Sequence, residues 1–172
     1  MKSQIQPTNV EQKMREEDFI VSKTDTKGVI TYCNRIFMEF AKYQEHELIG
    51  QQHNIIRHPD MPRCIFKLLW DTIKQKKEIN AYVKNMSSDG SYYWVHANVT
   101  PVIDDRGDIQ GYYSVRRKPN EERLEKVKQL YKTLLAEERK YGLKEGLQAS
   151  SELLNNTLKN ADKSYEEFIF TL

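Results

Sequence analysis

Short runs rich in β-branched and aromatic residues occur in two groups along the first 118 residues of the chain. Such runs are typical of β-strands, and turn residues such as Gly28 and Gly90 separate them. Because the links are short, we expect neighbouring strands to pair antiparallel. The predicted strands are residues 19–21, 29–33, 79–86, 92–103 and 109–117.

Between the two groups of strands, hydrophobic positions recur every three or four residues, which predicts helices. Asn34 is well placed to cap the first helix, and Gly50 to end the second. In the third helix Pro62 fits the first turn, and the register of Trp70 directs its side chain toward the core. The predicted helices are residues 35–42, 45–49 and 61–77.

Residues 53–62, which read His-Asn-Ile-Ile-Arg-His-Pro-Asp-Met-Pro, fit neither the helical nor the strand pattern. The residues before Pro59 and Pro62 are pushed out of helical geometry, so an ordered loop is expected here. A loop with this much polar chemistry between apolar segments is a candidate binding site, and a solvated turn is the alternative. Asp60 is also well placed to cap the helix that follows.

The element order β-β-α-α-loop-α-β-β-β predicts an α+β domain over residues 18–118, with helices over one face of a five-stranded antiparallel sheet. Residues 1–17 are expected to form a mobile or partner-bound N-terminal cap, with a short helix through Val10 and Met14. Residues 119–172 predict two amphipathic helices, broken near Gly142 and Gly146. Their apolar face is expected to pack on a partner, as a homodimer or a mixed helix bundle. Folding back on the sheet is the alternative.

Composition narrows the classes of function. A net charge of +2 argues against a nucleic-acid surface. Cys33 and Cys64 are expected to be buried thiols in a reducing cytoplasm. No apolar run approaches a bilayer's thickness and no signal peptide is present, so a soluble cytoplasmic protein is expected, with any membrane role acting through a partner. No catalytic or metal-cluster pattern occurs, so we expect neither an enzyme nor a metal site.

Residues 53–62 resemble the His-Asn-hydrophobic-hydrophobic-Arg-His-Pro-Asp-Met-Pro motif of PAS domains from aerotaxis (energy-taxis) sensors, and the resemblance extends over roughly residues 18–118. It implies a domain that binds FAD non-covalently and reports its redox state to the chemotaxis machinery. By position, it implies that Arg57, His58 and Asp60 are cofactor-linked loop residues, and that Asn34 and Asn85 line the pocket. The donors of Arg57 and the paired donors and acceptors of each Asn suit a flavin.

The same resemblance leaves alternatives open. The family commonly has a Trp where this chain has Ile79 or Asn80, which motivates a cofactor-free adaptor or dimerisation module. A haem-binding PAS sensor is a further alternative, because the chain contains four His. The layout resembles the short, split form of energy-taxis sensor. In that form a free PAS protein works with a separate membrane-bound chemoreceptor, and the C-terminal helices would couple the two.

Overall fold

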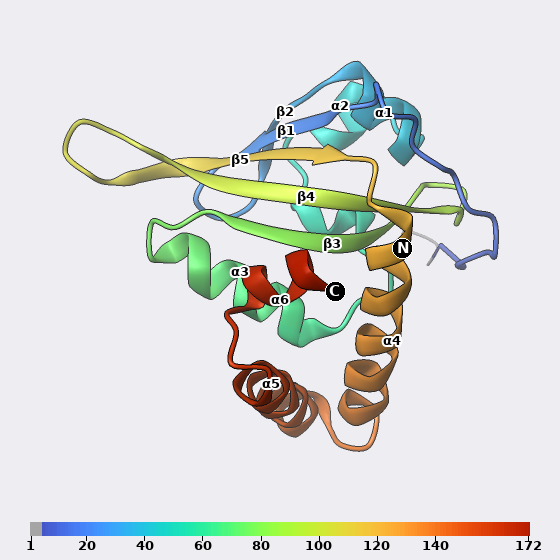
Figure 1. Cartoon of the computed structure of the whole chain (residues 1–172). Helices are drawn as coiled ribbons and strands as arrows, with labels where there is room; N and C mark the ends of the chain where they lie inside the picture. The colour runs from blue at the N-terminus through green and yellow to red at the C-terminus, as the bar shows by residue number, and fades with distance from the viewer. Residues whose placement is uncertain (1–4) are drawn as a thin grey trace.

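The computed structural model describes residues 5–172 of the chain. At its centre is a five-stranded antiparallel sheet in the order β2-β1-β5-β4-β3 (Figure 1). Pairing of Ser22 with Ser114 joins the N-terminal hairpin to the later strands. The predicted sheet is confirmed, with strands β1 (Ile20–Thr24), β2 (Ile30–Cys33), β3 (Ile79–Met86), β4 (Tyr92–Ile103) and β5 (Ile109–Arg117).

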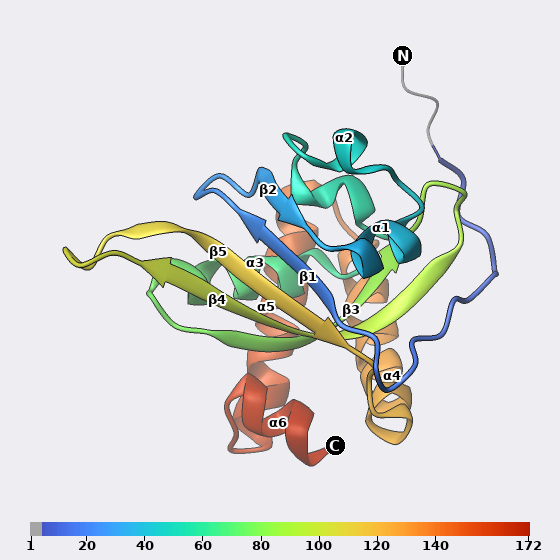
Figure 2. The same cartoon turned by 90° about the horizontal axis from the view of Figure 1, so that it is seen from above.

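One face of the sheet, which we call the inner face, is covered by the helices between β2 and β3. Figure 2 shows α1, α2 and α3 on this side, with α6 on the other. These segments are α1 (Arg35–Ala41), α2 (Glu45–Leu48), the 3-10 helix η1 (His53–Ile56) and α3 (Arg63–Lys74). Part of the motif expected to be only loop is therefore a single 3-10 turn.

Asn34 caps α1 as predicted, and it also ties that helix to β1. Its Oδ1 accepts hydrogen bonds from the Phe37 N–H at 3.0 Å and from the Val21 N–H at 3.0 Å. Its Nδ2 donates to the Phe19 carbonyl oxygen at 2.8 Å. All of these bonds are made to backbone groups, so the Asn34 amide has a structural role at this junction.

Asp60 does not cap α3, which corrects the prediction made for it. The helix begins at Arg63, with Pro62 as the N-cap residue and no side-chain capping bond from the loop. Instead, the Cys64 N–H in the first turn donates to the Glu138 carboxylate at 3.1 Å. A side chain far along the sequence thus satisfies the helix terminus, and Asp60 is left for other partners.

The N-terminal segment does not form the predicted helix within residues 5–17. It runs in an extended conformation beside the start of β4, where Gln12 N–H donates to the Tyr92 carbonyl and Tyr92 N–H donates to the Val10 carbonyl. The Gln12 side chain donates to Ser87 Oγ at 2.6 Å, and Met14 is buried. The cap is therefore packed on the domain, and residues 1–4 lie outside the described part.

The C-terminal segment contains three helices, α4 (Glu121–Glu138), α5 (Leu143–Asn160) and α6 (Tyr165–Thr171), where two were predicted. They fold back on their own domain: α5 packs against α3, and α6 contacts β3. Tyr131 of α4 is buried and donates its hydroxyl hydrogen to the Tyr82 carbonyl at 2.7 Å. The apolar face of this segment is therefore buried within the same chain and not on a partner, because α4 and α5 pack on each other, α5 packs on α3, and α6 packs on β3.

Within the described residues, no helix combines the length and apolar character that crossing a membrane requires.

Candidate functional site

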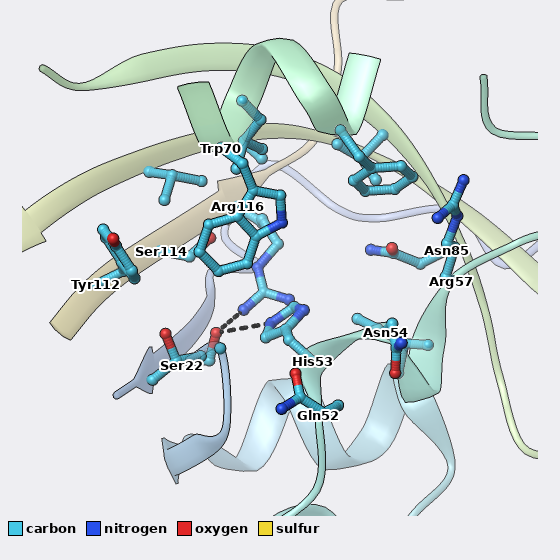
Figure 3. Close-up of a pocket in the computed structure, with 18 of the residues that line it drawn as sticks. Ser22, Gln52, His53, Asn54, Arg57, Trp70, Asn85, Tyr112, Ser114 and Arg116 are labelled. Carbon is cyan, nitrogen blue, oxygen red and sulfur yellow. Dashed lines mark hydrogen bonds between the residues drawn. The ribbon is translucent and has the colours of Figure 1, made fainter. Parts of the chain in front are cut away.

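A cavity of about 250 Å³ lies between the inner face of the sheet, the loop that begins with η1, and α3 (Figure 3). Alternate residues of β5 face it, because side chains one strand position apart point to opposite faces of a sheet. Its lining combines a largely apolar wall with a polar side. The residues are Ser22, Thr24, Gly28, Gln52, His53, Asn54, Ile56, Arg57, Phe66, Leu69, Trp70, Ile73, Val83, Asn85, Ala97, Val99, Tyr112, Ser114 and Arg116.

The apolar wall is one face of α3. Phe66, Leu69, Trp70 and Ile73 recur at helical spacing and line the cavity together. The Trp70 ring meets the ring of Tyr112 edge-on, with centroids 5.5 Å apart and an interplanar angle of 86°. Trp70 packs against the hydrophobic core, as its helical register predicts, and its indole also forms part of the cavity surface.

Arg116 of β5 is the most unusual group in the cavity. It is only 2% exposed, and its guanidinium donates to the Ser22 hydroxyl. Its Nε and Nη1 have no hydrogen-bond partner among residues 5–172, and the Phe37 ring lies 4.7 Å from its guanidinium carbon. Burial lowers the pKa of Arg116 to about 10, so the group stays charged at neutral pH. A buried cation with two unpaired donors is costly unless a ligand supplies acceptors.

His53 stands beside this cation and is neutral. Its Nε2 lies 3.2 Å from the Ser22 hydroxyl, and its ring stacks on Phe37 with centroids 5.8 Å apart. Burial, with the positive charge of Arg116 as a second cause, lowers the pKa of His53 to about 3. Ser22 accepts from Arg116 and can donate its own proton to the unprotonated His53 Nε2. The three side chains form one connected polar group, seen in Figure 3.

Of the residues singled out from the sequence, Arg57 and Asn85 line the cavity. An isolated antiparallel bridge joins their backbones, which places the loop along the edge of β3. The Arg57 guanidinium lies 4.4 Å from the centre of the Phe66 ring, a cation–π arrangement that holds it at the cavity wall. Asn85 is 4% exposed and presents an amide with both donors and an acceptor.

His58, Asp60 and Asn34 do not line the cavity. His58 is buried, its Nδ1 accepts the Asp60 N–H at 3.0 Å, and burial lowers its pKa to about 4. The Asp60 carboxylate contacts Lys84 and Arg139, each at 3.3 Å. These two residues therefore shape the loop and connect it to α4, while Asn34 holds α1 to β1.

The sequence reasoning missed Arg116, Ser22 and the cavity position of Trp70, and it did not select His53 as a ligand-facing residue. One signal was present: Tyr112, Ser114 and Arg116 occupy alternate positions of a strand, so they share a face. An arginine on the inner face of the sheet is unusual, because arginine is rarely fully buried without a partner. The side chains next to Arg116 are Ser22 of β1 and His53 of the loop, and sequence patterns over a few residues do not predict that these segments meet.

Known proteins show the same architecture. The family model that describes the PAS fold matches residues 30–116, and the chain belongs to this family. The aerotaxis receptor of Escherichia coli (strain K12) is 38% identical over 123 residues, which cover 72% of this chain and 24% of the receptor. The nitrogen fixation regulatory protein of Klebsiella pneumoniae is 29% identical over 97 residues, or 56% of this chain and 20% of that protein. The resemblance to an aerotaxis PAS domain is thus confirmed, and the chain spans a quarter or less of these relatives.

Solved structures support the fold. A light-oxygen-voltage domain studied with a flavin analogue superposes with a TM-score of 0.55 at 20% identity, covering 63% of this chain and 82% of that chain. The light-state structure of the blue-light photoreceptor Aureochrome1 LOV gives a TM-score of 0.54 at 21% identity, covering 69% and 90%. At this level of identity the likeness concerns the fold alone.

Proposed function

We propose that this chain is a redox sensor that binds FAD non-covalently in the cavity and signals to the chemotaxis machinery. The observation that carries the proposal is Arg116, a buried cation with two unpaired N–H groups beside an aromatic wall. Such a site favours a planar heteroaromatic group with acceptor atoms on its edge. The 38% identity with the aerotaxis receptor supports the same choice.

The lining residues fit the flavin ring. Phe66, Leu69 and Trp70 offer flat apolar surface, and Asn85 offers an amide that can pair with both donor and acceptor atoms. Arg116 offers positive donors for a carbonyl oxygen or for negative charge on the ring. A cavity of about 250 Å³ lies just below the usual range of ligand pockets, roughly 300–1,000 Å³, so it would enclose a part of FAD such as the flavin ring and not the whole molecule.

FAD supplies redox chemistry, and its reduction changes the charge and hydrogen bonding of the ring. In the proposed mechanism, the contacts that Arg116 and Asn85 would make with the ring differ between its oxidised and reduced states. Arg116 lies at the end of β5, and β5 leads through Pro119 into α4. The final strand thus passes the change to the C-terminal helices. The proposed partner is a membrane-bound chemoreceptor, contacted from the cytoplasm by a homodimer of this chain, and the role requires no catalysis.

The test is the absorbance spectrum of the purified chain, as isolated and after incubation with FAD, before and after dithionite. Flavin bands that bleach on reduction are expected. The Arg116→Gln variant should hold less FAD and shift its reduction potential. Arg117→Gln, an exposed neighbour on the same strand, is the matched control and should match the parent in both readouts.

A folded chain that takes up no flavin would refute the FAD proposal and favour the cofactor-free adaptor. A Soret band would replace flavin with haem. Equal FAD occupancy and potential in both arginine variants would remove Arg116 from the site. Sedimentation equilibrium tests the dimer, and co-sedimentation with membranes that contain a chemoreceptor tests the partner.

A further inference from the structure

A second groove lies on the outer face of the sheet, between α4 and the paired strands β3 and β4. Its volume is about 400 Å³, and none of its lining residues borders the cavity described above. One face of α4 provides most of its wall, and the cross-strand pair Lys84–Trp94 provides the other side. The lining residues are Asp60, Lys84, Trp94, Lys128, Tyr131, Lys132, Leu135, Ala136 and Arg139.

The groove carries an excess of positive charge. Four of its lining side chains are cations: Lys84, Lys128, Lys132 and Arg139. Asp60 lies 3.3 Å from both Lys84 and Arg139, and it is the one carboxylate in the lining. Outside the lining, Glu125 pairs with Lys128 at 2.6 Å. Lys132 makes no ion pair within the described residues, so the groove offers more positive charge than its own carboxylates neutralise.

The floor of the groove is apolar. Trp94 is 8% exposed, and its ring packs near the buried ring of Tyr131 with centroids 6.2 Å apart. Lys128 Nζ lies 5.9 Å from the Trp94 ring, which keeps a cation at the edge of this floor. A ligand that combines negative charge with apolar side chains matches such a surface better than a small hydrated anion does.

The spacing of the cations favours an elongated ligand. Lys128 and Arg139 are separated by three turns of α4, which corresponds to about 16 Å along the helix. A single phosphate group cannot reach both ends. We propose that this groove binds an acidic peptide segment of a partner protein, with its carboxylates facing Lys128, Lys132 and Arg139 and an apolar residue on Trp94.

Binding of a peptide in the groove would affect residues 53–62 through Asp60. Peptide carboxylates would compete with the Asp60 carboxylate for Lys84 and Arg139. The backbone N–H of Asp60 donates a hydrogen bond to His58 Nδ1 at 3.0 Å. Arg57, one residue before His58, lines the cavity on the inner face. The groove therefore gives a partner a route to the cavity loop, and peptide binding itself does not depend on FAD.

The experiment measures fluorescence anisotropy of a fluorescein-labelled peptide of repeating Glu-Glu-Leu units, titrated with the full chain. Two double variants carry the same loss of charge. Lys128→Gln with Lys132→Gln removes groove cations, and Lys126→Gln with Lys140→Gln removes cations outside the groove lining. Because the groove variant loses two surface ion contacts with the peptide, it should bind about tenfold more weakly than the control, a difference of about 1.4 kcal/mol.

Circular dichroism and thermal melting check that both variants fold as the parent does. Equal weakening in the two variants would overturn the proposal, because it would show general charge attraction. Displacement of the peptide by inorganic phosphate at constant ionic strength would assign the groove to a small anion. Tighter binding of a labelled single-stranded oligonucleotide, lost in the groove variant alone, would assign it to nucleic acid. Both of these outcomes also refute the acidic peptide.

Discussion

The Glu138 carboxylate joins three helices, and its removal should destabilise the protein strongly. Glu138 is 5% exposed. One oxygen accepts from the Cys64 N–H at 3.1 Å and from the Ser150 hydroxyl at 2.9 Å, and the other lies 3.2 Å from Arg63 Nε. These contacts hold the first turn of α3 against α4 and α5. The perturbation is Glu138→Ala.

The size of the effect follows from the groups left behind. Cys64 is 2% exposed, so its N–H would lose its acceptor in a buried place, at a cost of about 1–3 kcal/mol. The guanidinium of Arg63, with 27% of its side chain exposed, would lose its carboxylate and keep the Leu143 carbonyl. Breaking a buried ion pair costs about 3–5 kcal/mol, and this pair is partly solvated. We expect Glu138→Ala to lower the free energy of unfolding by about 3 kcal/mol.

The assay is urea unfolding of the full chain followed by circular dichroism. Glu138→Gln keeps an acceptor oxygen and should lose about 1 kcal/mol. Glu137→Gln is the matched control on the same helix, because its pair with Lys140 is a surface contact worth at most about 1 kcal/mol. Hydrogen exchange at the Cys64 amide should speed up in Glu138→Ala. If Glu138→Ala unfolds at the same urea concentration as the control, the carboxylate does not hold these helices together.

Three further predictions concern other parts of the molecule. Gly90→Ala should lower the free energy of unfolding by more than about 1 kcal/mol in the same urea assay, because φ is +84° and a Cβ would collide with the Gln6 carbonyl oxygen. The folded-state pKa of His53, about 3, lies below the unfolded value of about 6.5, so the unfolded chain binds a proton first as pH falls. Stability should therefore decline from pH 6.5 toward pH 3, and His53→Gln should flatten that decline in urea midpoints; an unchanged slope would contradict it. Trp70→Leu should reduce FAD uptake per folded chain by absorbance, whereas Trp94→Leu on the outer face should not; equal losses would argue against Trp70 as cavity wall.

Local patterns were sufficient to predict much of the fold. Strand alternation, the Asn34 cap and the helical periodicities gave the order of elements up to β5, and the motif at residues 53–62 identified the family. These features depend on neighbours within a few positions along the chain. The motif also led to Arg57 and Asn85, which the structure places at the cavity.

Long-range contacts decided the rest. Arg116 belongs to the cavity because β1 and the loop bring Ser22 and His53 to it. Asp60 does not cap α3 because the helix begins only at Arg63, and the Cys64 N–H in its first turn pairs with Glu138 of α4.

The amphipathic pattern of residues 119–172 determined that an apolar face must be buried, but not which surface buries it. The tertiary structure buries that face within the same chain: α4 and α5 pack on each other, α5 packs on α3, and α6 packs on β3, while Tyr131 of α4 donates to the Tyr82 carbonyl. The physical reason is that hydrophobic burial is non-directional. A helix specifies the face that leaves water, while its partner is set by the shape and exposed edges of the whole domain.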